Sequence, residues 1–163
     1  MKKTMREAYL AGQGVLSAAI AWLSLRLGIM FWPLAILMIL MIIDYITGML
    51  ASKAEAIQYP DDPNYGWSSK KGVLGVMKKV GYLGIIVVAV CLDHIIVTTG
   101  SYWGYDVPLK GLIGVIVTVW LVLNEMLSIT ENSGRMGAPV PPWLAKYIAV
   151  LKGKIEKEAE ADE

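Results

Sequence analysis

The stretch "MIIDYITGML" (residues 41–50) places one carboxylate, that of Asp44, inside an apolar run long enough to cross a lipid bilayer. A charged side chain at the centre of a membrane-spanning helix costs about 2.5–3.5 kcal/mol on insertion scales. Asp44 therefore needs a charged partner, a water-filled surface or a function. The polar residues in the rest of the chain decide between these.

The whole chain is apolar. Of its 163 residues, 56% are hydrophobic and only 18% are charged, and the mean hydropathy is +0.53. These values are too apolar for an ordinary soluble domain of this length. The net charge is +1, and the basic residues do not cluster with aromatic residues on a periodic face, so no nucleic-acid partner is expected. The composition indicates a membrane protein.

Four apolar segments each approach the roughly 20 residues that a helix needs to cross the hydrocarbon core. They cover residues 8–25, 29–51, 80–100 and 109–129. A signal peptide is the rival interpretation of the first segment, but Gln13 interrupts the apolar run and the second segment follows closely. Only residues 26–28 separate the first two segments, which predicts a tight helical hairpin. We expect an all-α integral membrane protein with about four transmembrane helices in two hairpins.

The C-terminal part of the chain has a different character. Residues 1–138 are expected to form the transmembrane bundle, and "SGRMGAPVPP" (residues 133–142) ends its last helix. Residues 139–163 predict a cytoplasmic or interfacial amphipathic helix followed by an acidic tail. The apolar face of this helix would carry Trp143, Leu144, Tyr147, Ile148, Leu151 and Ile155.

The basic residues predict the orientation of the chain. If both termini are cytoplasmic, thirteen lysines and arginines lie on the cytoplasmic side, and only Arg26 and Lys110 lie outside. Such a bias follows the positive-inside rule. The thirteen are Lys2, Lys3, Arg6, Lys53, Lys70, Lys71, Lys78, Lys79, Arg135, Lys146, Lys152, Lys154 and Lys157.

Charged residues of different segments fall at one depth in this topology. Asp44 lies about 10 Å from the cytoplasmic end of its helix, at 1.5 Å per residue. Asn124 and Glu125 reach a similar depth in the fourth segment, and Lys78 and Lys79 reach it in the third. Buried charges are tolerated where they pair. We therefore predict an intramembrane network of ion pairs and hydrogen bonds among these five residues.

Asp93 and His94 form a second polar pair, in the outer half of the third segment, and need other partners. Tyr82, Ile86, Ala89 and Asp93 share a helical face with Lys79, which predicts that this face points into the bundle. For His94, a hydrogen-bonded packing or interface role is favoured over a proton sensor.

Small and polar residues recur at helical spacing in several segments, as they do where membrane helices pack closely. The same residues are candidates for lining water after a rearrangement. They are Gln13, Ser17 and Ser24 in the first segment, Gly48 in the second, and Gly111, Gly114 and Thr118 in the fourth.

No residue pattern indicates catalysis. The chain has no recognisable nucleophile motif and no phosphate-binding glycine loop. Its one cysteine, Cys91, excludes an intrachain disulfide, and His94 is its one histidine. We expect no enzyme activity, no metal site and no cofactor.

Several stretches in order resemble one known family, the toxin-secretion and phage-lysis holins (phage holin family four). They are "DYITG" (44–48), "SSKKGVLGVMKKVG" (68–81), "LD" (92–93) and "NEMLSITENSGRMGAPVPPWL" (124–144). The resemblance covers roughly residues 35–150, and the insertion "QYPDDPNYGW" (58–67) departs from it. By position, the family-like residues are Asp44, Gly48, Ser69, Gly72, Gly75, Lys78, Lys79, Asp93, Glu125, Ser128, Asn132, Gly137, Pro139 and Pro141.

The resemblance implies a small phage-encoded protein that accumulates in the bacterial inner membrane, oligomerises with itself, and makes timed lesions in it. Endolysin or other cargo is released through the lesions without required direct contact, and host lysis follows. Membrane lipid and an antiholin, soluble or membrane-bound, are the other implied partners. Two alternatives stay open: a small ion channel or transporter component whose acids line a permanent ion path, and a membrane anchor that recruits a soluble partner.

Overall fold

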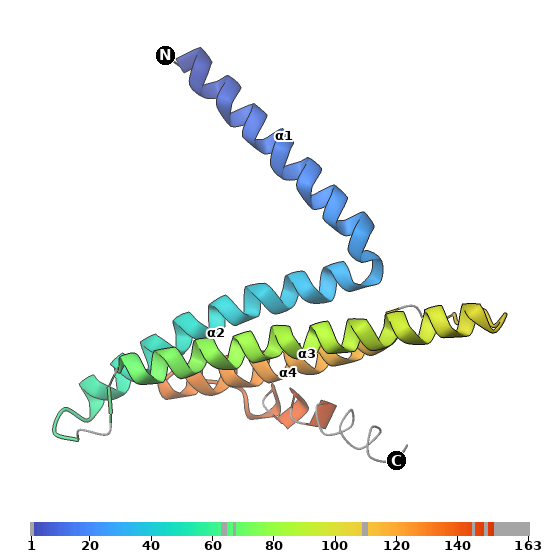
Figure 1. Ribbon diagram of the computed structural model, residues 1–163. Coiled ribbons are helices and arrows are strands. Elements are labelled where there is room, and N and C mark those ends of the chain that lie inside the picture. The colour runs from blue at the N-terminus through green and yellow to red at the C-terminus, as the bar shows by residue number, and fades with distance from the viewer. Residues whose placement is uncertain are drawn as a thin grey trace.

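The computed structural model describes residues 2–62, 65–66, 68–108, 111–144, 146–148 and 150–151, and in these residues it is all-helical with no strand. Its main elements are α1 (Lys2–Leu27), the one-turn 3₁₀ helix η1 (Gly28–Met30), α2 (Phe31–Gln58), α3 (Ser69–Tyr102) and α4 (Leu112–Arg135). Figure 1 shows α2, α3 and α4 side by side, with α1 projecting away from them.

Three stretches of helix are long and apolar enough to cross a membrane: Met5–Gln58, Ser69–Tyr102 and Leu112–Arg135. The first includes both α1 and α2. Large apolar side chains along these helices are exposed, among them Ile39, Val87 and Val88. Exposed apolar side chains on long helices are what a lipid environment favours. The expectation of an all-α membrane protein is confirmed at this level.

The tight hairpin expected between the first two segments is wrong. α1 passes through the one-turn η1 into α2 without an intervening loop, and the Phe31 amide donates to the Gly28 carbonyl, so the chain bends at η1 instead of reversing. Antiparallel helix pairs usually need a connection of about 2–5 loop residues. Gly28 has a φ of +51°, which suits glycine. The resulting elbow leaves α1 in contact with α2 and η1 among the described helices.

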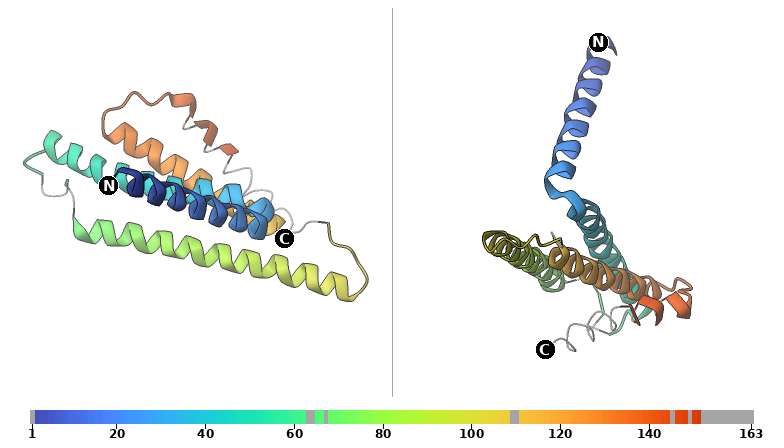
Figure 2. Two further views of the ribbon diagram at one scale, coloured as in Figure 1. Left: turned by 90° about the horizontal axis from the view of Figure 1, so that it is seen from above. Right: turned by 90° about the vertical axis from the view of Figure 1, so that its right-hand side faces the viewer.

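α4 packs extensively on α2 and less on α3, whereas α2 and α3 touch little. Close contacts pair Met30 with Gly114 at one end and Gly48 with Asn132 further along, so α2 and α4 run parallel. α3 runs antiparallel to both (Figure 2). The apolar core consists of Met30, Leu37, Met41, Tyr82, Ile86 and Leu121.

The face of α3 expected to point inward does so: Tyr82, Ile86, Ala89 and Asp93 are its buried residues.

The ends of the helices follow from local chemistry. Ser68 caps α3 by accepting a hydrogen bond from the Lys71 amide at 3.2 Å. After α4, the Ala138 amide donates to the Ser133 carbonyl and the Gly137 amide to the Gly134 carbonyl. This is a Schellman motif, and its left-handed position is taken by Gly137, with a φ of +87°. The turn therefore ends α4 where the sequence predicts it.

Beyond this turn, residues 142–144, 146–148 and 150–151 are helical. Ile148 is buried, while Trp143 and Tyr147 are exposed. Ile155 and the acidic tail lie outside the described residues, so the full amphipathic helix stays a prediction.

Candidate functional site

Polar side chains from α2 and α4 form two facing stripes at one end of the bundle. On α2 the stripe consists of Asp44, Ser52 and Glu55, with Gly48 on the same face, and on α4 it consists of Glu125, Ser128, Asn132 and Arg135. Each stripe follows the three-to-four residue spacing of one helical face. Because α2 and α4 are parallel and closely packed, the stripes meet along their length.

Lys79 of α3 lies between two carboxylates from different helices. Its Nζ donates to Asp44 Oδ2 at 2.8 Å and also to Glu125 Oε2. The side chain of Glu125 is 0% exposed, and those of Lys79 and Asp44 are 12% and 16% exposed. The three charges are therefore largely sequestered, and they join all three helices at one point.

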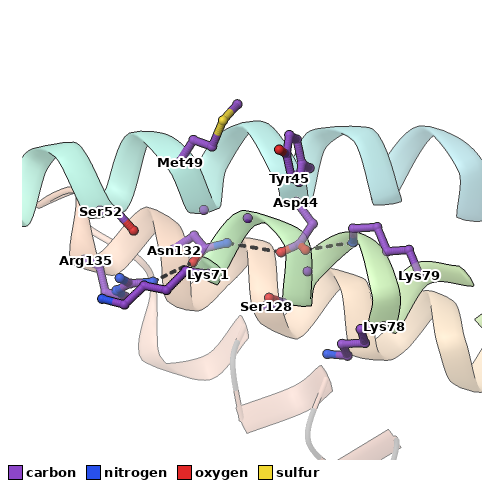
Figure 3. Close-up of a pocket in the computed structure, with 13 residues that line it drawn as sticks. Asp44, Tyr45, Met49, Ser52, Lys71, Lys78, Lys79, Ser128, Asn132 and Arg135 are labelled. Atoms are coloured by element: carbon purple, nitrogen blue, oxygen red, sulfur yellow. Dashed lines mark hydrogen bonds and ion pairs between the residues drawn. The ribbon is translucent and has the colours of Figure 1, made fainter. Parts of the chain in front are cut away.

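The network extends along the α2–α4 interface towards the nearby helix ends. Asn132 Nδ2 donates to Asp44 Oδ1 at 3.1 Å and to Thr47 Oγ1 at 3.3 Å. Arg135 Nη1 donates to Asn132 Oδ1 at 3.1 Å. Arg135 also pairs with Glu55 through two hydrogen bonds of 2.7 Å each. Both oxygens of Asp44 thus have partners, and a continuous chain of polar contacts links Glu125 to Glu55. Figure 3 shows the part of this chain from Lys79 through Asp44 and Asn132 to Arg135.

One atom of the network has no partner. Glu125 Oε1 is buried and accepts no hydrogen bond from the described part of the chain. A buried polar atom without a partner costs about 1–3 kcal/mol, and more when the group is charged. Only one of the two Glu125 carboxylate oxygens is therefore hydrogen-bonded, so Glu125 is the member of the cluster whose burial is least well compensated.

A pocket of about 350 Å³ lies beside the network, between α2, α3 and α4. Asp44, Asn132 and Arg135 line it from one side (Figure 3). Gly72 and Gly75 line it from α3, where the lack of side chains leaves room. Polar groups of the cluster therefore border open space within the bundle.

The structure does not bring every expected residue into the network. Lys78 Nζ lies 5.5 Å from the centre of the Tyr82 ring, in a cation–π contact, rather than at a carboxylate. Asn124 is half-buried, and no hydrogen bond joins it to Asp44, Lys79 or Glu125 in the described part of the chain. Asp44, Lys79 and Glu125 are the members of the expected set that meet.

Asp93 and His94 separate. Asp93 is buried and accepts hydrogen bonds from the amides of Ile113 (Oδ1, 3.1 Å) and Gly114 (Oδ2, 2.7 Å). It therefore caps the first turn of α4 from another helix, where a carboxylate is favoured by the free amides and the helix dipole. His94 is exposed on the other side of α3, since adjacent residues of a helix do not face each other.

The small residues of α4 lie where helices approach closely. A Cβ on Gly114 would meet Met30 Cε and Sδ at 3.0 Å and Asp93 Oδ2 at 3.2 Å. Thr118 is fully buried and donates to the Gly114 carbonyl, and Gly111 lies against Ile29 and Met30.

On α1, Gln13 and Ser17 are exposed and Ser24 is half-buried. Gln13 donates to the Tyr9 hydroxyl at 2.8 Å.

The sequence interpretation missed Thr47, Glu55 and the bonding of Arg135, and it had Asn132 from the family resemblance alone. A signal for them exists in the sequence. Continuing the Glu125 face by helical steps reaches Asn132 and Arg135, and continuing the Asp44 face reaches Glu55. Helical spacing alone cannot show that the two faces meet, because that depends on which pair of helices packs most closely.

Comparisons with known proteins show which family the chain resembles in sequence. The sequence profile of the bacteriophage holin family matches residues 21–153. An uncharacterized protein of Halalkalibacterium halodurans is 32% identical over 143 residues, which cover 88% of this chain and 93% of the relative. One from Listeria innocua is 30% identical over 125 residues, or 77% of this chain and 75% of the relative.

A protein of Bacillus phage phi105, named "Probable holin", is 24% identical over 131 residues, which cover 80% of this chain and 82% of that protein. No solved structure matches the chain. The profile match contains α2, α3, α4 and the polar network, and it leaves out most of α1. The chain therefore belongs to the bacteriophage holin family, a membrane-permeabilising and non-enzymatic class.

Proposed function

We propose that this protein oligomerises in the bacterial inner membrane and, after a delay, forms lesions that release endolysin or other cargo. The observation that carries the proposal is the position of Lys79 between Asp44 and Glu125. One ammonium bonds to carboxylates from two other helices while those helices stay packed. The same groups prefer water once the helices separate.

The proposed rearrangement moves α3 relative to the α2–α4 pair. α2 and α4 share a long interface with a second ion pair, Glu55–Arg135, whereas α2 and α3 touch little. Movement of α3 withdraws Lys79 and exposes Asp44 and Glu125. Removing one partner of a buried pair costs about 3–5 kcal/mol unless water or another charge replaces it. Water that enters between the helices solvates the exposed carboxylates and so stabilises a second arrangement of α3. The bundle then has two stable packings, which is the property of a two-state element.

The proposed topology has four spanning helices and cytoplasmic termini, on the basis of the positive-inside rule and the thirteen-to-two distribution of basic residues. α1 has 26 residues, or about 39 Å at 1.5 Å per residue, which is enough to cross a hydrocarbon core of about 30 Å. This topology requires α1 to fold back against α2 in the bilayer by further bending at η1. The network end of the bundle would face the cytoplasm.

The proposed partners are other copies of the same chain, membrane lipid and an antiholin. α1 presents exposed apolar residues on all sides, including Val15, Ile20 and Trp22. In a bilayer such a helix is free to pack on a neighbouring subunit through its small residues. Endolysin, or a secreted toxin, would pass through the lesion without binding to it.

Timed expression in a bacterium tests the proposal against the two alternatives. The full chain is induced while a potential-sensitive dye and a cytoplasmic reporter enzyme are followed. A lesion-forming protein gives a delay, then an abrupt collapse of potential together with release of the enzyme. Immediate, graded leakage without enzyme release would instead indicate an ion channel. No leakage at matched membrane abundance would indicate an anchor.

A further inference from the structure

The basic pocket beside the network adjoins an apolar groove on the same bundle. The groove has a volume of about 300 Å³ and lies between α2 and α3, where those helices touch little. Tyr45 and Lys79 border both the pocket and the groove. Apart from these two, its lining is apolar: Met38, Met41, Ile42, Ile46, Val76, Val80 and Leu83. A charged compartment and an apolar one are therefore continuous.

The two compartments match the layers of a membrane. α3 has 34 residues, or about 51 Å, and extends about 10 Å beyond each side of a 30 Å hydrocarbon core if centred. Lys71 then lies at the level of the headgroups, and Lys78, about 14 Å from the start of the helix, lies near the hydrocarbon boundary. The groove continues inward from there along Val80 and Leu83.

Cationic side chains outnumber carboxylates in the lining of the pocket. Lys71, Lys78, Lys79 and Arg135 line the pocket, whereas Asp44 is the one carboxylate in its lining. Lys79 pairs with Asp44 and Glu125, Arg135 pairs with Glu55, and Lys71 has an interaction of its own. Lys78 is exposed, and its described ring contact is with Tyr82 rather than with an acid. An ammonium at this depth favours an anionic partner from the membrane.

We propose that the pocket and groove bind one anionic glycerophospholipid. The phosphate lies at Lys78, on the side of the pocket that Lys71 and Arg135 also line, and one acyl chain lies in the groove between α2 and α3. Positive pockets between membrane helices recognise anionic headgroups in this way. A second protein helix would satisfy the groove but not the lysines. The lipid would then occupy the α2–α3 space that must change when α3 moves.

The test uses the purified full-length chain in detergent, mixed with equal amounts of dioleoyl-phosphatidylglycerol and dioleoyl-phosphatidylcholine. Native mass spectrometry measures which lipid stays bound. We expect phosphatidylglycerol to be retained at one per chain in preference to phosphatidylcholine. Lys78→Gln should reduce this preference about fivefold, since a lysine near an anionic surface contributes on the order of 1 kcal/mol.

Two further variants separate the site from general surface charge. Lys70→Gln is the matched control, because Lys70 is exposed on the same helix but does not line the pocket. It should leave the preference unchanged. Gly75→Leu places a side chain in the pocket and should abolish retention. A Cβ at Gly75 has nothing within 4 Å, and the unfolding temperature in detergent should therefore stay unchanged.

Equal retention of the two lipids would overturn the proposal, as would equal effects of Lys70→Gln and Lys78→Gln. A cysteine at Val80, on a Cys91→Ser background, tests the competing occupant. Disulfide-linked dimers formed through that cysteine in phosphatidylglycerol vesicles would show that a second copy fills the groove instead.

Discussion

Lys79 Nζ lies 2.8 Å from Asp44 Oδ2 and also donates to Glu125 Oε2, so one ammonium of α3 holds carboxylates of α2 and α4. The cluster carries two acids for one base, and it is more than four-fifths buried on each side chain. Its stability therefore depends on Lys79 more than on either acid. This asymmetry leads to different expectations for the three residues.

Asp44→Asn should shorten the delay before lysis more than Glu125→Gln does. Asp44 uses both oxygens, one for Lys79 and one for Asn132, and asparagine retains a single acceptor. Glu125 uses one oxygen, and glutamine keeps it. We expect a cost of about 1–2 kcal/mol for Asp44→Asn, since lysine can extend towards the interface and water, and less for Glu125→Gln. Lysis time at matched membrane abundance provides the measurement. The reverse order would contradict the one-sided bonding of Glu125.

Asp93→Ala should destabilise the end of the bundle at which α4 begins. It leaves the amides of Ile113 and Gly114 without their acceptor, at about 1–3 kcal/mol for each buried group. The check is the unfolding temperature in detergent micelles. His94→Ala is the matched control, because His94 is exposed on the same helix, and it should change that temperature little. An equal fall for both variants would mean that Asp93 does not cap α4.

Gly114→Ala should also lower the unfolding temperature, for a steric reason. Its Cβ would meet Met30 and Asp93 at 3.0–3.2 Å, so either α2 or the cap must shift. Overpacking of this kind costs about 1–3 kcal/mol. Gly84→Ala is the control, because nothing lies within 4 Å of a Cβ there. If both substitutions leave the unfolding temperature unchanged, α2 and α4 lie further apart at Gly114 than the structure places them.

Cysteine labelling from either side of the membrane tests the topology, in a Cys91→Ser background. If four helices span, cysteines at Glu7 and Tyr65 react only from the cytoplasm, and one at Trp103 reacts only from outside. If α1 lies on the surface instead, Glu7 and Tyr65 react from opposite sides. The second result would leave three spans and reverse the proposed position of the N-terminus.

The sequence predicted much of this arrangement because membrane helices reveal themselves by length and apolarity. The buried face of α3 also followed, since Tyr82, Ile86 and Asp93 share a helical stripe. The meeting of Asp44 with Lys79 was expected from equal depth alone. Depth did not separate Lys79 from its neighbour Lys78, because adjacent residues differ by about 100° around a helix, and the rotation of α3 is set by packing.

The elbow between α1 and α2 escaped prediction for a related reason. A three-residue separation is compatible with a reversal or with a continued helix, and residues 26–28 carry no proline to exclude helix. The partners of Asp93 were likewise hidden, because backbone amides leave no signature in a sequence. Which amides lie near a carboxylate depends on how α4 begins after Gly111.

In the proposed function, the Lys79–Asp44–Glu125 cluster acts as a charge lock, which holds α3 against α2 and α4 in the closed state. The most direct test of this lock compares Lys79→Gln with the double variant Asp44→Asn/Lys79→Gln. Lys79→Gln leaves two neighbouring carboxylates without a cation, so it should give the earliest lysis of the single variants. Adding Asp44→Asn removes one of these charges and should restore part of the delay. If the second substitution stabilises the closed state by about 1.4 kcal/mol, the equilibrium between closed and open assemblies shifts about tenfold towards the closed one. Lys70→Gln serves as the control in both backgrounds. Lysis time at matched membrane abundance should therefore be longer for the double variant than for Lys79→Gln, and a double variant that lyses as early or earlier would contradict the lock.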